Sequence, residues 1–267
     1  MFHSNQKILS AAAVVLCGSS AALAQHADVF LADDGGKVVA GSAFVTPNGA
    51  PPPSEVFAIQ SLGDRVFEGE LLDVGLVPTQ YSGDEPGFNG THDAALFTGA
   101  FAAFAKLPGS AAVSFDILSS TVDSESSDLF FWDGTGPVTF APVTASTVLT
   151  VGNPSFASTD GDGAPGFTFA NTAGSGFLHH HMTFTVAKDA GTAAADAGFY
   201  LLTLQLNVAG LNSSDSLFFV FGTEGSDEAA HEQAIDWVSD NLAAIPEPTT
   251  LGLLALAAPM MLRRRMK

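Results

Sequence analysis

The chain has 267 residues, of which 46% are hydrophobic and 14% are charged, and it contains 22 Phe and 27 Gly. This composition excludes wholesale disorder, because it supplies enough apolar side chains for a core, and it favours strands over surface helices rich in Lys and Glu. Between residues 25 and 245, 27 carboxylates face four basic side chains, a formal charge of −23. Such a surface repels phosphate backbones, so we expect no nucleic-acid partner.

Residues 1–24 have the parts of a secretory signal peptide: a basic start, an apolar run, and the small residues Ala22 and Ala24 at the cleavage site. Signal peptidase is expected to cut before Gln25. The only cysteine, Cys17, would leave with the peptide. The mature chain would then have no disulfide, no cysteine-based metal site and no cysteine nucleophile.

Residues 25–226 predict one all-β domain. A hairpin is expected over residues 26–44, because Asp33–Gly36 provides the glycines that a tight turn requires. A Pro-rich loop follows at Pro47–Ser54, and Arg65–Leu72 has the pattern of a further strand.

The stretch Tyr81–Asp93 is rich in Gly and acidic residues, which predicts a long surface loop. Ala94–Lys106 predicts a short helix or an irregular apolar segment. Short apolar runs separated by turn residues then predict eight strands, at residues 111–118, 128–132, 137–140, 146–151, 166–169, 176–186, 197–208 and 217–222. Many short strands with turns between them indicate a β-sandwich or a jelly roll.

Residues 227–244 differ from this pattern and predict a helix. Ser226 is a suitable N-cap, and apolar side chains recur at helical spacing, at Ala234, Ile235, Val238 and Leu242. We expect this helix to pack on the β domain.

Residues 245–267 contain a motif, an apolar stretch and a basic end. The motif is Pro246-Glu247-Pro248, the apolar stretch is Leu251–Leu262, and the basic end includes Arg263, Arg264 and Arg265. This tail resembles the PEP-CTERM sorting signal of bacteria that make extracellular polysaccharide. The resemblance implies cleavage near the motif by an exosortase-type membrane protease.

The apolar stretch of this tail is shorter than the ~20 residues that a stable membrane span needs, so it suits a transient transmembrane helix. The basic end would stay in the cytoplasm, with the rest of the chain outside. The expected location is therefore the cell envelope, the cell surface or the extracellular matrix, and the expected partners are signal peptidase, the exosortase-type protease, the membrane and extracellular polysaccharide.

Three shorter motifs also resemble poorly characterised exported PEP-CTERM proteins. They are His26–Val29, Asp84–Phe88 and Phe131–Gly136. This resemblance implies a shared fold and brings no activity with it.

The histidine run His179-His180-His181 is the most distinctive candidate site. On a strand, His179 and His181 would share one face, and two imidazoles at this spacing can bind one transition metal. A third ligand would come from His92, His26 or an acidic loop. The alternative is that His179 and His181 are half-exposed sheet residues and that His180 is a core histidine.

Acidic residues offer a second kind of cation site. Asp160 and Asp162 alternate with glycines, and carboxylate oxygens are the ligands that calcium prefers. The loop is too short for an EF-hand, and a plain acidic turn is the alternative. A similar cluster spans Asp123–Asp128. The cofactor thus stays open between none, calcium and a transition metal.

No Gly-x-Ser-x-Gly elbow and no His-Glu-x-x-His motif occur, and no catalytic residue is predicted. The sequence therefore favours a non-catalytic surface or matrix protein. The alternative is a secreted metal-binding protein or metal-dependent enzyme centred on His179 and His181. A third option is glycan binding by aromatic residues, although each of these is expected in the core: Tyr81, Trp132, Tyr200 and Trp237.

Overall fold

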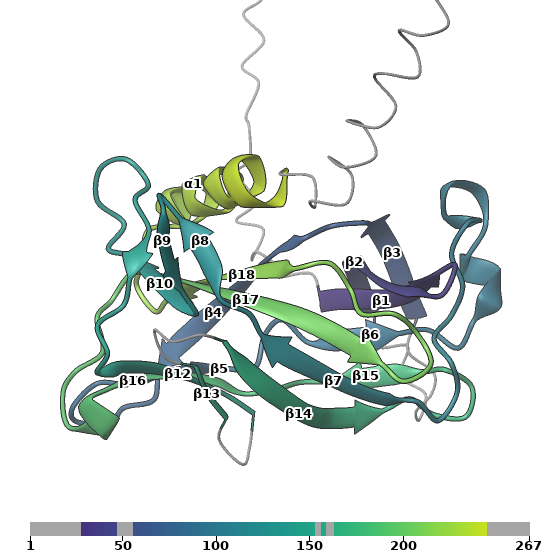
Figure 1. The fold of residues 1–267 in the computed structure, drawn as a ribbon, viewed down its shortest axis with the longest axis horizontal. Coiled ribbons are helices and arrows are strands. Elements are labelled where there is room, and N and C mark those ends of the chain that lie inside the picture. Colours follow the sequence, from purple (N-terminus) through teal and green to yellow (C-terminus); the bar gives the residue numbers. More distant parts are fainter. Residues whose placement is uncertain (1–27, 47–55, 153–155, 159–162, 245–267) are drawn as a thin grey trace, which may run out of the picture.

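A computed structural model of the protein describes residues 28–46, 56–152, 156–158 and 163–244. Strands in curled sheets dominate this part of the chain, with one α-helix near its C-terminal end (Figure 1). The predicted all-β class with a C-terminal helix is therefore confirmed.

The predicted signal peptide, Pro-rich loop and sorting tail lie outside these ranges. None of the helices in the described part has the length and apolar character needed to cross a membrane.

The first sheet has five strands, and β1 lies at its centre. The order is β15 (Leu178–His180), β6 (Phe88–Gly90), β1 (Asp28–Asp34), β2 (Lys37–Thr46) and β3 (Val56–Leu62). The strands β1 and β2 form the predicted hairpin, with Gly35 and Gly36 at φ of 58° and 98° in the turn. The Gly36 amide donates a hydrogen bond of 2.6 Å to Asp33 Oδ1, which closes the turn.

The second sheet has eleven strands and wraps around the core. Its main path is β11 (Ala141–Pro142), β10 (Leu129–Trp132), β17 (Phe199–Val208), β18 (Leu217–Thr223), β4 (Val66–Asp73), β5 (Tyr81–Gly83), β16 (Phe184–Lys188), β12 (Thr147–Val151) and β13 (Phe156–Ser158). A branch runs from β17 to β7 (Ala112–Ile117) and β14 (Ala164–Asn171). A separate hairpin joins β8 (Ser120–Val122) and β9 (Glu125–Ser127).

Several strand predictions need correction. Tyr81–Asp93 is not a surface loop, because it holds β5 and β6, and β6 is buried. The single strand expected at residues 176–186 is two strands, β15 and β16, in different sheets. Pro137–Phe140 is not a strand, and β3 was not expected. The segment after β6 forms two short 3-10 turns, Ala94–Leu96 and Gly99–Phe101.

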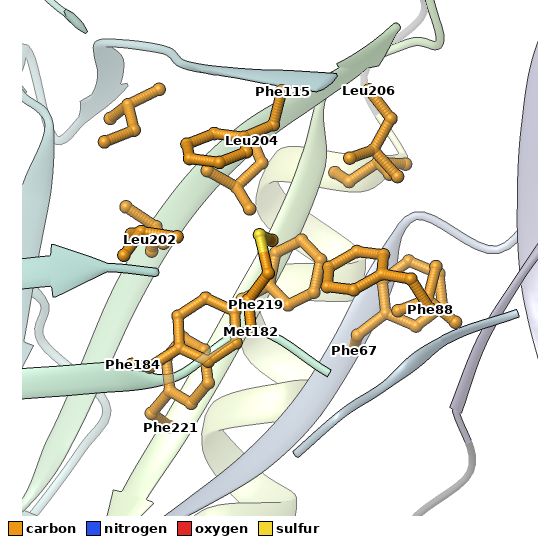
Figure 2. Close-up of a cluster of buried hydrophobic side chains, with 14 of the residues drawn as sticks. Phe67, Phe88, Phe115, Met182, Phe184, Leu202, Leu204, Leu206, Phe219 and Phe221 are labelled. Carbon is orange, nitrogen blue, oxygen red and sulfur yellow. The ribbon is translucent and has the colours of Figure 1, made fainter. Parts of the chain in front are cut away.

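The main core lies between the two sheets and is rich in phenylalanine (Figure 2). Phe88 of β6 contributes from the first sheet and Phe219 of β18 from the second, with ring centroids 6.2 Å apart. Alternate residues of β17 and β18 face this core, while Phe199, Leu201, Phe218 and Val220 pack in the cluster under the helix. All of β18 is therefore buried, whereas Gln205 and Asn207 in the second half of β17 are half-buried.

Helix α1 (Glu228–Val238) covers the outer face of β18. Its N-cap is Asp227 rather than the expected Ser226, because the Asp227 carboxylate accepts a hydrogen bond of 3.0 Å from the Ala230 amide. His231 is buried, and its Nε2 donates to the Val220 carbonyl at 3.0 Å. The helix is thereby tied to the sheet, as the sequence predicted.

Candidate functional site

A polar cluster lies at the start of β1 and beside β6 and β15. We call it the histidine site, and its members are Asp28, Asp84, Glu85, Asn89, His179 and His181. Three segments far apart in the sequence meet here because β6 pairs with β1 on one side and with β15 on the other.

The sheet register decides which way each side chain points. Asn89 lies directly opposite His179, and Phe88 lies opposite His180. Directly opposite residues share a face of the sheet, so His179 lies on the side of Asn89 and His180 lies on the side of the core. The His180 ring is 5.4 Å from that of Phe169. Burial, and then the neighbouring histidines, lower the pKa of His180, which favours a neutral packed ring.

The two outward-facing histidines meet through their Nε2 atoms, which are 3.0 Å apart. His181 Nδ1 lies 3.0 Å from the Asp84 carbonyl oxygen. A carbonyl only accepts, so we infer that Nδ1 donates and that Nε2 of neutral His181 carries a lone pair directed at His179. The structure thus brings together the two imidazoles that the sequence singled out.

Two further groups hold the ring of His181 in place. Glu85 Oε1 lies 3.6 Å from His181 Nδ1, on the side away from His179. Gly87 lies against the ring, since a Cβ at this position would be 2.6 Å from His181 Cε1. A side chain at position 87 would therefore displace the imidazole.

Asp28 anchors the segment that carries these groups. Its Oδ1 accepts a hydrogen bond of 2.9 Å from the Gly87 amide, and its Oδ2 accepts one of 2.6 Å from Asn89 Nδ2. Asn89 is fully buried, and its Oδ1 has no hydrogen-bond partner among the described residues. An unpaired buried amide oxygen costs about 1–3 kcal/mol, a cost that a hydrogen-bond donor or a cation beside Asn89 Oδ1 would remove.

Glu85 makes the stability of this region depend on pH. Burial, and then the neighbouring Asp28, raise the pKa of Glu85, while His181 acts in the opposite direction. A raised carboxyl pKa contributes stability that is complete below the unfolded value of ~4.3 and is lost as pH rises through the folded pKa. We therefore expect Glu85→Gln to gain stability relative to the wild type as pH rises from 4 to 7.

Urea unfolding of both proteins at each pH, with EDTA present, measures this difference. Parallel pH profiles for the two proteins would show that Glu85 does not titrate as described.

The other predicted ligands do not join the histidine site. The ring of His92 lies 6.0 Å from that of Phe177, and its buried Nδ1 has no hydrogen-bond partner within the described ranges. Within those ranges, no group of three or more His, Cys, Asp or Glu side chains is placed to hold a metal. His26 lies outside them.

The acidic candidates from the sequence have two outcomes: some lie outside the described residues, and others have a structural role. Asp160 and Asp162 fall outside the described residues, as do the predicted cleavage and sorting residues Ala22, Ala24, Pro246, Glu247, Pro248, Arg263, Arg264 and Arg265. In the second acidic cluster, Asp123 forms the turn between β8 and β9 with φ of 48°. Asp128 is buried, and its Oδ1 accepts a hydrogen bond of 2.7 Å from the Gly163 amide. Asp123 and Asp128 therefore have structural roles, one in a hairpin turn and the other in a buried hydrogen bond.

The aromatic residues considered for glycan binding are largely in the core, as expected. Trp132 is 3% exposed and stacks on Phe199 at 5.3 Å, and Tyr200 is 1% exposed. The Trp237 ring packs 5.7 Å from that of Phe140. Trp132 and Tyr200 thus offer no exposed ring face to a sugar.

Sequence reasoning missed Asp28, Glu85 and Asn89 as members of the site. The available signal was the pair of motifs His26–Val29 and Asp84–Phe88, which the fold brings side by side. In comparisons with known proteins, the chain matches no family model and no curated protein. The PEP-CTERM resemblance therefore stays a prediction from the sequence motifs.

Proposed function

We propose that the chain is an exported cell-surface or extracellular-matrix protein whose β domain acts by binding rather than by catalysis. The observation that carries this proposal is the order of sequence patterns along the chain: a segment with the pattern of a signal peptide, one β-rich unit, and a tail that resembles a sorting signal. The tail would be cut by an exosortase-type protease and would hold the protein at the membrane until then.

Both expected processing sites lie outside the described residues. The described strands and helices run from Asp28 to Ala243, so cleavage at both expected sites would remove none of them.

We also propose that the two larger sheets form a sandwich of the jelly-roll type. The contact between Phe88 and Phe219 across the core supports this arrangement. Such domains close their sheets against each other and present loops and edges for binding.

A binding role suits the acidic surface. The charge of −23 between residues 25 and 245 would concentrate cations near the protein, which is useful in a polysaccharide matrix. Three surface hollows in the described part have volumes of about 80, 240 and 340 Å³, and none of the three is lined by His179 or His181.

Processing at the two ends tests the proposal. In a bacterium with an exosortase-type system, we expect the protein outside the cytoplasm with an N-terminus at Gln25 and without its basic end. Replacing Pro246, Glu247 and Pro248 by Ala should leave the tail attached and the protein in the membrane fraction, whereas T249A/T250A should be processed normally. Intact mass and cell fractionation measure both results, and a wild-type chain that keeps both ends in the cytoplasm would refute the proposal.

A further inference from the structure

The distance between the two imidazoles of the histidine site matches that of two ligands on one metal ion. Nitrogen atoms bound to one zinc ion at 2.0–2.1 Å are about 3.3 Å apart at a tetrahedral angle and about 2.9 Å apart at a right angle. The Nε2 atoms of His179 and His181 are 3.0 Å apart. A metal could therefore replace the hydrogen bond between them with only small movements of the rings.

The groups behind His181 are those that orient a metal ligand. Histidines that bind metals commonly donate their other ring N–H to a carbonyl or a carboxylate, which fixes the tautomer. His181 Nδ1 has the Asp84 carbonyl at 3.0 Å and the Glu85 carboxylate at 3.6 Å. Nε2 is thereby left as the lone-pair nitrogen.

An independent observation lies on the facing strand. Asn89 is directly opposite His179, and opposite side chains have Cβ atoms roughly 5 Å apart. Asn89 Nδ2 donates a hydrogen bond to Asp28, whereas the buried Asn89 Oδ1 has no hydrogen-bond partner among the described residues. A buried oxygen acceptor without a partner, on the same face as the histidine pair, is a group that a bound ion or its water could satisfy.

We propose that His179 and His181 bind one divalent transition-metal ion through their Nε2 atoms, with Asn89 Oδ1 beside it as an oxygen donor for the metal or its water. Imidazole nitrogen selects ions such as Zn²⁺ and Cu²⁺, whereas calcium selects sites made entirely of oxygen. The two histidines leave coordination positions for water or for an exogenous ligand. This site is independent of the export proposed above, because it depends only on the fold of the β domain.

Zinc titration of the full-length gene product tests this proposal. The protein is isolated untagged from the cells that express it, stripped with EDTA, dialysed, and titrated calorimetrically with ZnCl₂ and separately with CaCl₂. We expect one zinc ion per chain and much weaker binding of calcium. In H179Q/H181Q, zinc affinity should fall about tenfold or more, which corresponds to at least ~1.4 kcal/mol.

The middle histidine supplies the matched control. H180Q removes an imidazole from the same run but on the core side of the sheet, so its zinc affinity should equal that of the wild type. Circular dichroism without metal establishes that each variant is folded. If H179Q/H181Q unfolds, H179Q alone replaces it, because His179 is exposed and its substitution should be tolerated. Equal zinc binding by the wild type and the folded histidine variants, or zinc binding no tighter than that of calcium, would overturn the proposal.

Discussion

Phe219→Ala is expected to destabilise the domain by about 3–5 kcal/mol, the range measured for phenylalanine truncations in protein cores. Phe219 is fully buried, and its ring lies 5.5 Å from that of Phe67 and 6.2 Å from that of Phe88. Because Phe88 belongs to the other sheet, the truncation would leave a cavity at the contact between the two sheets (Figure 2). Urea denaturation followed by circular dichroism measures the loss.

Val77→Ala is the control for this experiment. Val77 is 99% exposed, so its truncation should change the free energy of unfolding by less than about 0.5 kcal/mol. A similarly small effect of Phe219→Ala would mean that the two sheets do not share the core described above.

Asp28→Ala is expected to cost about 3 kcal/mol of stability. The Asp28 carboxylate is 8% exposed and accepts hydrogen bonds from the Gly87 amide and from Asn89 Nδ2. Hydrogen bonds to a charged group contribute about 1.5–3 kcal/mol each, and their loss leaves the buried Asn89 Nδ2 without its acceptor, while the Gly87 amide keeps Glu85 Oε2 at 3.1 Å. The substitution would loosen β6 from the start of β1, and with it the segment that orients His181.

Asp34→Ala is the matched control, because Asp34 lies at the exposed end of the same strand. It should change stability by less than about 0.5 kcal/mol. Chemical denaturation in EDTA compares the two variants, and equal stabilities would show that Asp28 does not anchor the site.

The regular parts of the fold could be predicted from the sequence because their signals are local. The β1–β2 hairpin follows from two glycines between apolar runs, and β17 and β18 follow from long apolar runs bounded by turn residues. Helix α1 follows from apolar residues at helical spacing, although its cap is one residue later than expected. None of these elements requires knowledge of a distant partner.

The segment Tyr81–Asp93 could not be predicted because its strands are too short to show a period. Both β5 and β6 have three residues, set among Gly, Pro and acidic residues that normally mark loops. They are strands because β5 pairs with β4 and β16, and β6 pairs with β1 and β15. Pairing with distant strands decided this structure, and composition could not reveal it.

The histidine run shows which part of the site strand periodicity could predict. Alternation placed His179 and His181 on one face, and the structure brings their Nε2 atoms together. The same reasoning extended the strand to Val186, whereas the chain leaves the first sheet after His180 and enters the second at Phe184. Thr183 therefore lies between the strands rather than beside the histidines. The acidic and amide groups of the site come from segments whose proximity only the fold establishes.

The most direct test of the central claim, that the domain holds a metal ion between His179 and His181, is a crystal structure of the protein soaked with zinc. Diffraction data collected on both sides of the zinc absorption edge would locate the ion by its anomalous signal. We predict one strong peak within bonding distance of both Nε2 atoms, about 2.0–2.1 Å from each. Zinc found only at surface carboxylates, with the two imidazoles still hydrogen-bonded to each other, would contradict the claim.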